Sequence, residues 1–444
     1  MIRCFKGSLL SCAEPSTYLM KLFNVSTILS GSSVTRISAV TALLLFSFIF
    51  SCKKNDGNPA PTPTPPVPPV LGTMNINLAA GDEEVIFSEA GGKVLLDTLP
   101  PFHNHLVATL RTDQALVDVT VIGYDSLGKN YVLTTLKGVN PSIWSTLGFG
   151  GYDAPVGDLS STAGYMVYTH VPDPVRLTPF LLDDYVGGFG SSGNDYSVPG
   201  SLGLNYIRHG NSNYLYLLFP NSGLYNFHIP KGPTDTVDLS KMDTAVKLTF
   251  TKPVQYTMQP ATLIGIMDTT DFTKSLFLYS GAGYLGIPDM EYPKKLVQKF
   301  ELYTSATSST NINVSYYSYG NTVPSALPFP DESAYSISST QNNNFGVKFV
   351  APHPTYYQTT WKTSSVLWLV YASPDSTTLN PLGLLTALKS KSLKGQDLSG
   401  LSLSTFSFEN VQGLDYPGFF SYECNPDQVK ARRVASSASL TKKF

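Results

Sequence analysis

The sequence predicts an all-β protein made of two or three β-sandwich-like modules in series. Three observations support this fold class. Short runs of alternating or β-branched residues recur along the chain and are separated by turn residues. Only 14% of the residues are charged, whereas 42% are hydrophobic, a balance that provides a core beneath a neutral polar surface. Residues 381–391 form the one convincing helical pattern, because Asn380 can cap the segment and Pro381 can open it.

Residues 72–147 are predicted to form the first β-sandwich. Six short runs of strand-forming residues occur here, with Gly, Pro or Asp between them. The runs cover residues 74–78, 85–87, 93–96, 106–110, 116–124 and 131–136. The segment from Val117 to Tyr131 resembles prealbumin-like accessory domains, and an immunoglobulin-like sandwich is the alternative for these modules.

Two further domains are expected beyond this module. Residues 148–295 are rich in glycine and contain strand-like runs at 214–219, 225–229, 246–250, 262–267 and 276–279. Residues 296–444 are predicted to form a C-terminal β domain with one short helix at 381–391. Its strand-like runs cover residues 296–303, 311–319, 346–350 and 365–371, and a second short helix is possible at 427–434.

The N-terminus has the features of a lipoprotein signal peptide. Residues 37–50 are uncharged and mostly apolar, a length that suits a signal peptide and falls short of the roughly 20 residues that span a bilayer. The segment ends Ile49-Phe50-Ser51-Cys52, which resembles a lipobox, with an aliphatic residue three positions before the cysteine and a small one directly before it. The resemblance implies cleavage after residue 51 and lipidation of Cys52, although Phe50 departs from the usual pattern.

Residues 52–71 are predicted to form the lipidated cysteine and a tether. The sequence NPAPTPTPPVPPV at residues 58–70 favours polyproline II, at ~3.1 Å per residue. The run from Ser51 to Asp56 resembles that of surface lipoproteins of the Bacteroidota type. This resemblance covers the leader and tether only. It implies an outer-membrane protein held by its lipid anchor, with the body exposed at the cell surface.

Charge and cysteine content exclude several classes of protein. The segment before Cys52 has four basic residues and one acidic residue, so a chain with net charge −2 leaves −5 for the mature part. A mildly acidic body gives no reason to expect nucleic acid as a partner. Beyond Cys52 only Cys424 remains, which rules out an internal disulfide framework. The sequence contains no G-x-S-x-G, P-loop, G-x-G-x-x-G, H-E-x-x-H or EF-hand pattern, and we expect no catalytic residues, metal or cofactor.

Aromatic residues among neutral polar ones are the strongest indication of a ligand-binding surface. The candidate residues are Tyr316, Tyr317, Tyr356, Tyr357 and Trp361, which stand among Ser, Thr, Asn and Gln. Exposed aromatic rings in such surroundings bind sugar rings and protein surfaces. The alternative is packing within a core or between strands, which is common for tyrosines on strands.

These features predict a lipid-anchored cell-envelope protein that acts as a non-catalytic binding or adhesion module for a glycan or an outer-membrane protein. One alternative is a hydrolase acting on polysaccharide or peptide, with its carboxylates in loops; the pair Asp183-Asp184 is one candidate. The other is an envelope structural protein that binds no ligand.

Overall fold

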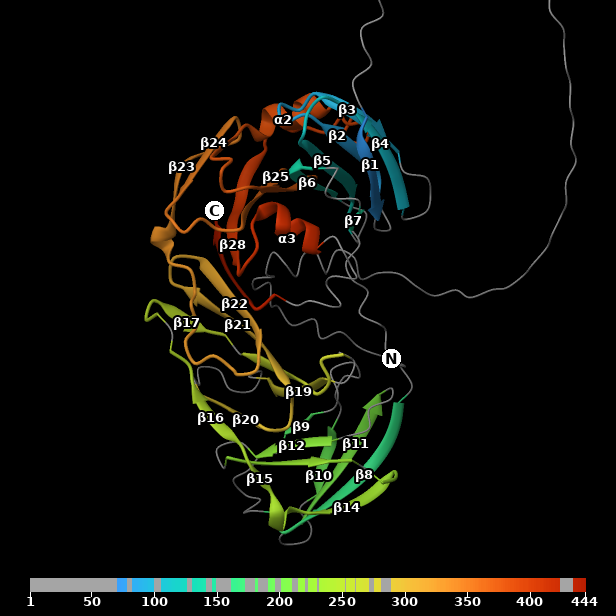
Figure 1. Ribbon diagram of the computed structural model, residues 1–444, viewed down its shortest axis with the longest axis vertical. Helices are drawn as coiled ribbons and strands as arrows, with labels where there is room; N and C mark the ends of the chain where they lie inside the picture. Colours follow the sequence, from blue (N-terminus) through green and yellow to red (C-terminus); the bar gives the residue numbers. More distant parts are fainter. Residues whose placement is uncertain are drawn as a thin grey trace, which may run out of the picture.

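The computed structural model confirms an all-β protein (Figure 1). It describes residues 70–77, 82–99, 105–125, 130–140, 146–148, 161–171, 180–182, 191–195, 201–209, 215–219, 223–229, 231–251, 253–259, 261–270, 275–280, 289–423 and 434–444. Cys52, most of the tether and most of the possible helix at 427–434 lie outside these residues. In the described part of the chain, no helix is both long and apolar enough to span a bilayer.

The largest sheet in the described part of the chain has 13 strands. Its strands follow the order β19 (Ser275–Ser280), β18 (Thr262–Ile266), β21 (Lys299–Ser308), β22 (Ile312–Gly320), β29 (Ser436–Lys443), β28 (Ser402–Val411), β25 (Tyr356–Lys362), β26 (Val366–Ala372), β6 (Tyr131–Val139), β5 (Val117–Tyr124), β2 (Asp82–Ser88) and β3 (Val94–Thr98). The thirteenth strand, β17 (Tyr256–Met258), pairs with β21. The C-terminal strand β29 therefore lies inside the sheet, between β22 and β28.

Each of the six strands predicted within residues 72–147 is found. Strands β4 (His105–Arg111), β1 (Val70–Asn77) and β7 (Thr146–Gly148) form a second layer opposite β2, β5 and β6. Strand β4 alternates as a half-buried strand should, with Leu106, Ala108 and Leu110 buried and Val107 exposed. These residues pack against Phe87 and its neighbours in the N-terminal core.

Strand pairing crosses both of the domain boundaries expected at 147 and 295. Strand β6 pairs in parallel with β26, so that Leu133 lies opposite Trp368. Strand β18 pairs with β21, so that Leu263 lies opposite Leu302. The segments 72–147, 148–295 and 296–444 thus share one sheet.

The other side of the sheet carries the main core. Strands β23 (Tyr335–Gln341), β24 (Asn344–Phe349) and β27 (Thr378–Leu379) form a small sheet, whose Phe345 and Phe349 pack on Phe406 of β28. Helix α2 (Pro381–Leu388) adds Leu385 and Leu388 to this core. The Asn380 side chain accepts a hydrogen bond from the Gly383 N–H, as predicted, but the helix ends at Leu388, before the predicted 391.

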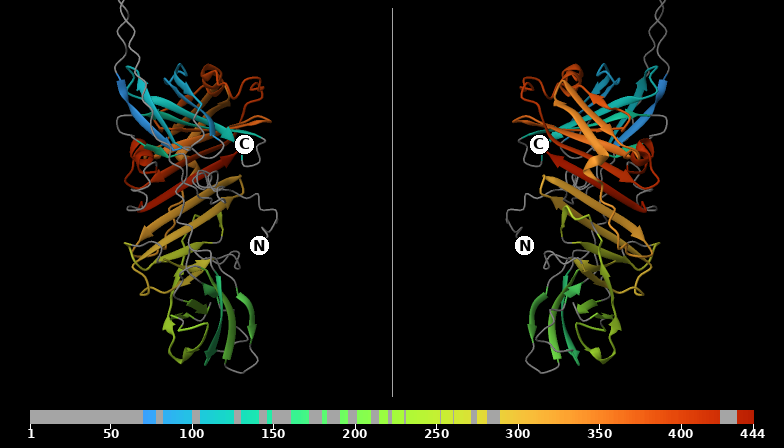
Figure 2. Two further views of the ribbon diagram at one scale, coloured as in Figure 1. Left: turned by 90° about the vertical axis from the view of Figure 1, so that its right-hand side faces the viewer. Right: turned by 90° about the vertical axis from the view of Figure 1, so that its left-hand side faces the viewer.

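Smaller sheets occupy the end of the molecule opposite the N-terminal sandwich (Figure 2). One sheet has the order β10 (Ser191–Asp195), β11 (Ser201–His209), β8 (Ser161–Thr169) and β14 (Thr234–Asp238). Another has the order β15 (Asp243–Thr244), β13 (Leu224–His228), β12 (Leu215–Phe219) and β9 (Phe180–Leu182). A two-stranded sheet pairs β16 (Val246–Thr249) with β20 (Asp289–Tyr292).

Candidate ligand-binding face

Strands β21, β22, β29, β28 and β25 carry side chains of opposite character on their two faces. Residues directly opposite each other across a pair of strands share a face, and side chains alternate along each strand. One face is apolar and belongs to the main core, with Leu302, Leu440 and Phe406 among its members. We call the other the polar face. It comprises Lys299, Glu301, Tyr303, Ser305, Thr307, Asn313, Ser315, Tyr317, Tyr319, Ser437, Ser439, Thr441, Lys443, Thr405, Ser407, Glu409, Tyr356, Gln358 and Thr360, together with the buried Val411 opposite Ser437.

Three of the five aromatic residues predicted for binding lie on the apolar face. Tyr357 and Trp361 have no exposed surface, and Tyr316 is 8% exposed. The Trp361 ring packs edge-on against Phe345, and its Nε1–H donates to Thr359 Oγ1 over 2.9 Å. The expectation of exposed rings is therefore wrong at these positions, where packing within the core is the correct interpretation.

The other two predicted residues, Tyr317 and Tyr356, lie on the polar face. Tyr356 is buried beneath α3 (Tyr416–Glu423), where its ring stacks on Phe419 with centroids 4.7 Å apart. Tyr317 is partly exposed and lies on β22, near the outer half of the face. Only Tyr317 among the five is thus placed to meet a ligand from solvent.

Tyr317 belongs to a cluster of three tyrosines that we call the tyrosine cluster: Tyr303, Tyr317 and Tyr319. Tyr303 lies opposite Tyr317, and their ring centroids are 4.9 Å apart at an interplanar angle of 47°. The Tyr317 hydroxyl donates to Glu301 Oε1 over 3.1 Å. Lys299 Nζ lies 5.8 Å from the centroid of the Tyr319 ring. Tyr303 is 38% exposed, so the cluster offers aromatic surface to solvent with polar groups beside it.

Neutral polar side chains also cross the sheet beside the tyrosine cluster, in a row that begins at Thr307, four positions along β21 from Tyr303. One row, which we call the neutral row, crosses five strands in register and consists of Thr307, Asn313, Thr441, Ser407 and Gln358. In the adjacent row the hydroxyls of Ser315 and Ser439 lie 2.6 Å apart. Exposure falls along the neutral row, from partly exposed at Thr307 to 4% at Gln358.

Gln358 is the last residue of the neutral row, and its side-chain oxygen is a hydrogen-bond acceptor that no described donor satisfies. Its Nε2 donates to Thr360 Oγ1 over 3.3 Å, whereas its Oε1 is buried without a hydrogen-bond partner in the described structure. A buried amide oxygen in this state is costly, because it has lost water and gained no donor. The polar face therefore has one acceptor that a bound donor would satisfy.

The two carboxylates of the polar face are not arranged as a catalytic pair. Glu409 accepts a hydrogen bond from the Tyr356 hydroxyl over 2.5 Å, and burial raises the pKa of its carboxyl. Glu301 lies three strands and four register positions away, which corresponds to about 20 Å at the usual strand spacing and rise. Acid–base pairs in glycoside hydrolases are about 5–10 Å apart. These two groups are too distant to act on one bond.

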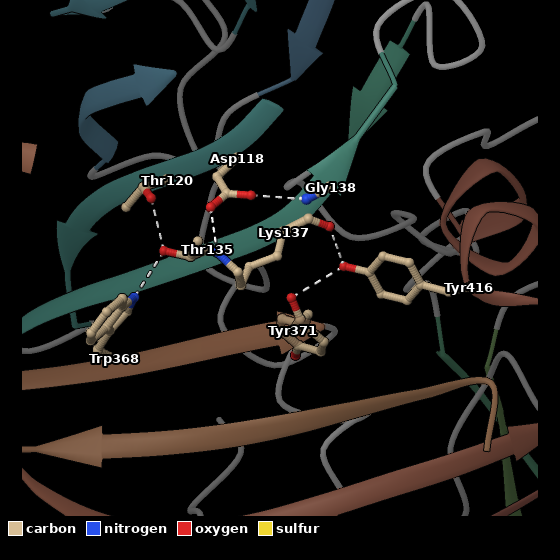
Figure 3. Close-up of polar contacts among 8 residues, drawn as sticks. All are labelled: Asp118, Thr120, Thr135, Lys137, Gly138, Trp368, Tyr371 and Tyr416. Carbon is tan, nitrogen blue, oxygen red and sulfur yellow. Dashed lines mark hydrogen bonds and ion pairs between the residues drawn. The ribbon is translucent and has the colours of Figure 1, made fainter. Parts of the chain in front are cut away.

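A second polar site lies near α3, at the edge of the N-terminal core (Figure 3). Lys137 Nζ lies 2.5 Å from Asp118 Oδ2, and these side chains are only 13% and 2% exposed. The Gly138 N–H donates to Asp118 Oδ1 over 2.9 Å. The Tyr416 hydroxyl donates to the carbonyl oxygens of Lys137 and Tyr371, over 2.6 and 3.1 Å.

Next to this ion pair, the Trp368 Nε1–H donates to Thr135 Oγ1, whose oxygen lies 2.8 Å from Thr120 Oγ1 (Figure 3). Every one of these side chains contacts a neighbouring strand or α3. The site thus fastens α3 and β26 to the N-terminal sandwich, and it is structural in character.

No group of three or more His, Cys, Asp or Glu side chains suited to a metal occurs in the described part of the chain. His228 Nε2 lies 3.0 Å from Asp235 Oδ2, a contact that joins the end of β13 to β14. The candidate pair Asp183-Asp184 lies outside the described residues.

No model of a known protein family matches this chain, and no curated protein sequence matches it.

Proposed function

We propose that this protein is a lipid-anchored, non-catalytic binding module of the cell envelope, and that it captures its ligand with the polar face around the tyrosine cluster. The anchor is the diacylglycerol on Cys52. The tether of residues 58–70 then holds the body away from the outer membrane, toward the outside of the cell.

The observation that carries the proposal is the tyrosine cluster itself. Tyrosine rings bind apolar faces of sugars and side chains of proteins, and their hydroxyls bind polar groups. Tyr303, Tyr317 and Tyr319 combine both properties on adjacent strands of a rigid sheet. Rigid aromatic groups lose little conformational entropy on binding, which favours affinity.

The alternative of a polysaccharide or peptide hydrolase has less support. Its acid and base would need to lie close together, and the two carboxylates of the polar face are about 20 Å apart. A hydrolase would also turn over its ligand, so incubation with bound polymer distinguishes this alternative from capture.

Affinity electrophoresis of the full-length protein in detergent, through gels containing single polysaccharides, tests capture. We expect at least one polysaccharide to retard the wild type and to retard Tyr303→Ala less. Tyr124→Ala is the matched control, because Tyr124 and Tyr131 form another cross-strand tyrosine pair, with centroids 4.5 Å apart, on β5 and β6. Equal retardation of both variants would exclude the tyrosine cluster as the site, and shortening of the polymer would favour the hydrolase.

Protease treatment of intact cells tests the proposed location. We expect the body to be digested on unbroken cells and Cys52→Ala to be released from the membrane fraction. Digestion only after the outer membrane is opened would place the body in the periplasm and contradict surface capture.

A further inference from the structure

We infer that the ligand of the polar face is an uncharged polysaccharide that runs from the tyrosine cluster onto the neutral row and then lies across the strands toward Gln358. This inference rests on the proposed function and adds the ligand class and the direction of binding.

The balance of charge on the polar face favours an uncharged ligand. Its charged side chains are two lysines and two glutamates: Lys299, Lys443, Glu301 and Glu409. Glu301 accepts a hydrogen bond from Tyr317, and Glu409 accepts one from Tyr356, so both carboxylates are held by the protein. A site for an anionic polymer would instead need clustered lysine or arginine side chains.

The direction of binding follows from the register of the strands. The neutral row places an uncharged donor or acceptor on each of five successive strands, about 4.8 Å apart. Along a strand, by contrast, same-face groups are about 6.6 Å apart, and on β29 and β28 the groups next to the neutral row are Lys443 and Glu409. A chain of sugar hydroxyls therefore finds closely spaced neutral partners only across the strands.

Gln358 supplies independent support for a ligand at the inner end of the neutral row. Its Oε1 is buried without a hydrogen-bond partner in the described structure, and the residue is 4% exposed. A sugar hydroxyl can donate to this oxygen, whereas a carboxylate or sulfate group on an anionic polymer would repel it. The unsatisfied atom thus favours a hydroxyl-rich, uncharged ligand.

The experiment compares binding of the full-length protein to uncharged polysaccharides (dextran, galactomannan and laminarin) and anionic ones (alginate, hyaluronate and heparin). We expect at least one uncharged polymer to bind and the anionic ones not to bind. We also expect Gln358→Leu to weaken binding about fivefold to tenfold, the effect of one lost hydrogen bond. Thermal unfolding provides the folding check: Gln358→Leu removes the unsatisfied oxygen together with the long Nε2 hydrogen bond to Thr360, so the melting temperature should change little.

Two results would overturn this inference while leaving the proposed function standing. One is binding of an anionic polymer that Tyr303→Ala abolishes, which would show that the class of ligand is wrong. The other is binding of an uncharged polymer that Tyr303→Ala weakens but Gln358→Leu and Asn313→Leu leave unchanged, which would show that the ligand does not cross the sheet. Binding that no variant of the polar face alters would overturn both the inference and the proposed function.

Discussion

Tyr303 and Tyr317 face each other across strands β21 and β22, with ring centroids 4.9 Å apart, on the side of the sheet that does not contribute to the main core. Their backbone neighbours Leu302 and Tyr316 point to the opposite side and are buried. The same two strands therefore supply an aromatic surface and a hydrophobic core. This division separates variants that affect binding from variants that affect stability.

Trp361→Ala should lower the free energy of unfolding by about 3–5 kcal/mol, because it removes a fully buried ring from the core. Chemical denaturation monitored by fluorescence measures this change. Ligand affinity of the folded variant should stay within about twofold of wild type. Normal stability together with reduced affinity in this variant would show that Trp361 contributes to ligand binding.

Lys137→Met should destabilise the protein by about 3–5 kcal/mol, because it leaves the Asp118 carboxylate buried without its charged partner. The double variant Lys137→Met with Asp118→Leu should recover part of the loss, since it removes both charges. Free energies of unfolding of the wild type, the two single variants and the double variant give the coupling energy. Additive effects would contradict a direct interaction between these side chains.

Glu409→Gln should stabilise the protein at neutral pH and have little effect below about pH 4. Burial raises the pKa of Glu409 in the folded state. The stability that the protonated Glu409 contributes is therefore fully present below the unfolded pKa of about 4.3. This contribution is lost as the pH rises through the folded pKa. The amide stays uncharged and can still accept from Tyr356. Melting temperatures of wild type and variant from pH 3 to 8 should diverge with rising pH; parallel curves would contradict the argument.

Glu84→Ala should release the segment that follows α2. The Glu84 carboxylate accepts hydrogen bonds from the backbone N–H groups of Lys391 and Ser392, over 2.9 and 3.0 Å, and from the Ser390 hydroxyl. Without it these donors lose their partner, at a cost of about 2–4 kcal/mol. Limited trypsin digestion should then cut at Lys389, Lys391 or Lys394 faster than in wild type. An unchanged digestion pattern would show that packing alone holds the segment.

Local patterns predicted the strands that alternate cleanly, including all six of the N-terminal sandwich. Strand β25 was missed because Gln358, Thr359 and Thr360 make it polar at its centre, although Tyr356 to Thr359 are buried. Strand β28 was also missed, although its buried residues Leu403, Phe406 and Phe408 are apolar. The alternation is interrupted between Leu403 and Phe406, next to a register shift between Thr360 and Trp361 of the partner strand β25. Helix α3 begins Tyr416-Pro417-Gly418, which favours a turn in the sequence alone.

The sequence also could not show which tyrosines of the candidate site lie on the core face and which on the polar face. Alternation in Tyr316-Tyr317-Ser318-Tyr319 predicts that neighbouring tyrosines point to opposite faces, but it does not identify the core face. That choice depends on Tyr303 and on strand β29, which pair with β22 from distant parts of the chain. The parallel pairing of β6 with β26 likewise joins segments more than 200 residues apart, so sequence periodicity contains no sign of it.

The most direct test of the tyrosine cluster as a binding site compares two double variants of the full-length protein. Tyr303→Ala with Tyr317→Ala removes the tyrosine cluster's stacked pair, and Tyr124→Ala with Tyr131→Ala removes the matched pair on β5 and β6. Titration calorimetry against the retarding polysaccharide should show affinity lowered at least about tenfold in the first variant and unchanged in the second. Equal affinities for both double variants and wild type would contradict the assignment of the polar face as the ligand-binding surface.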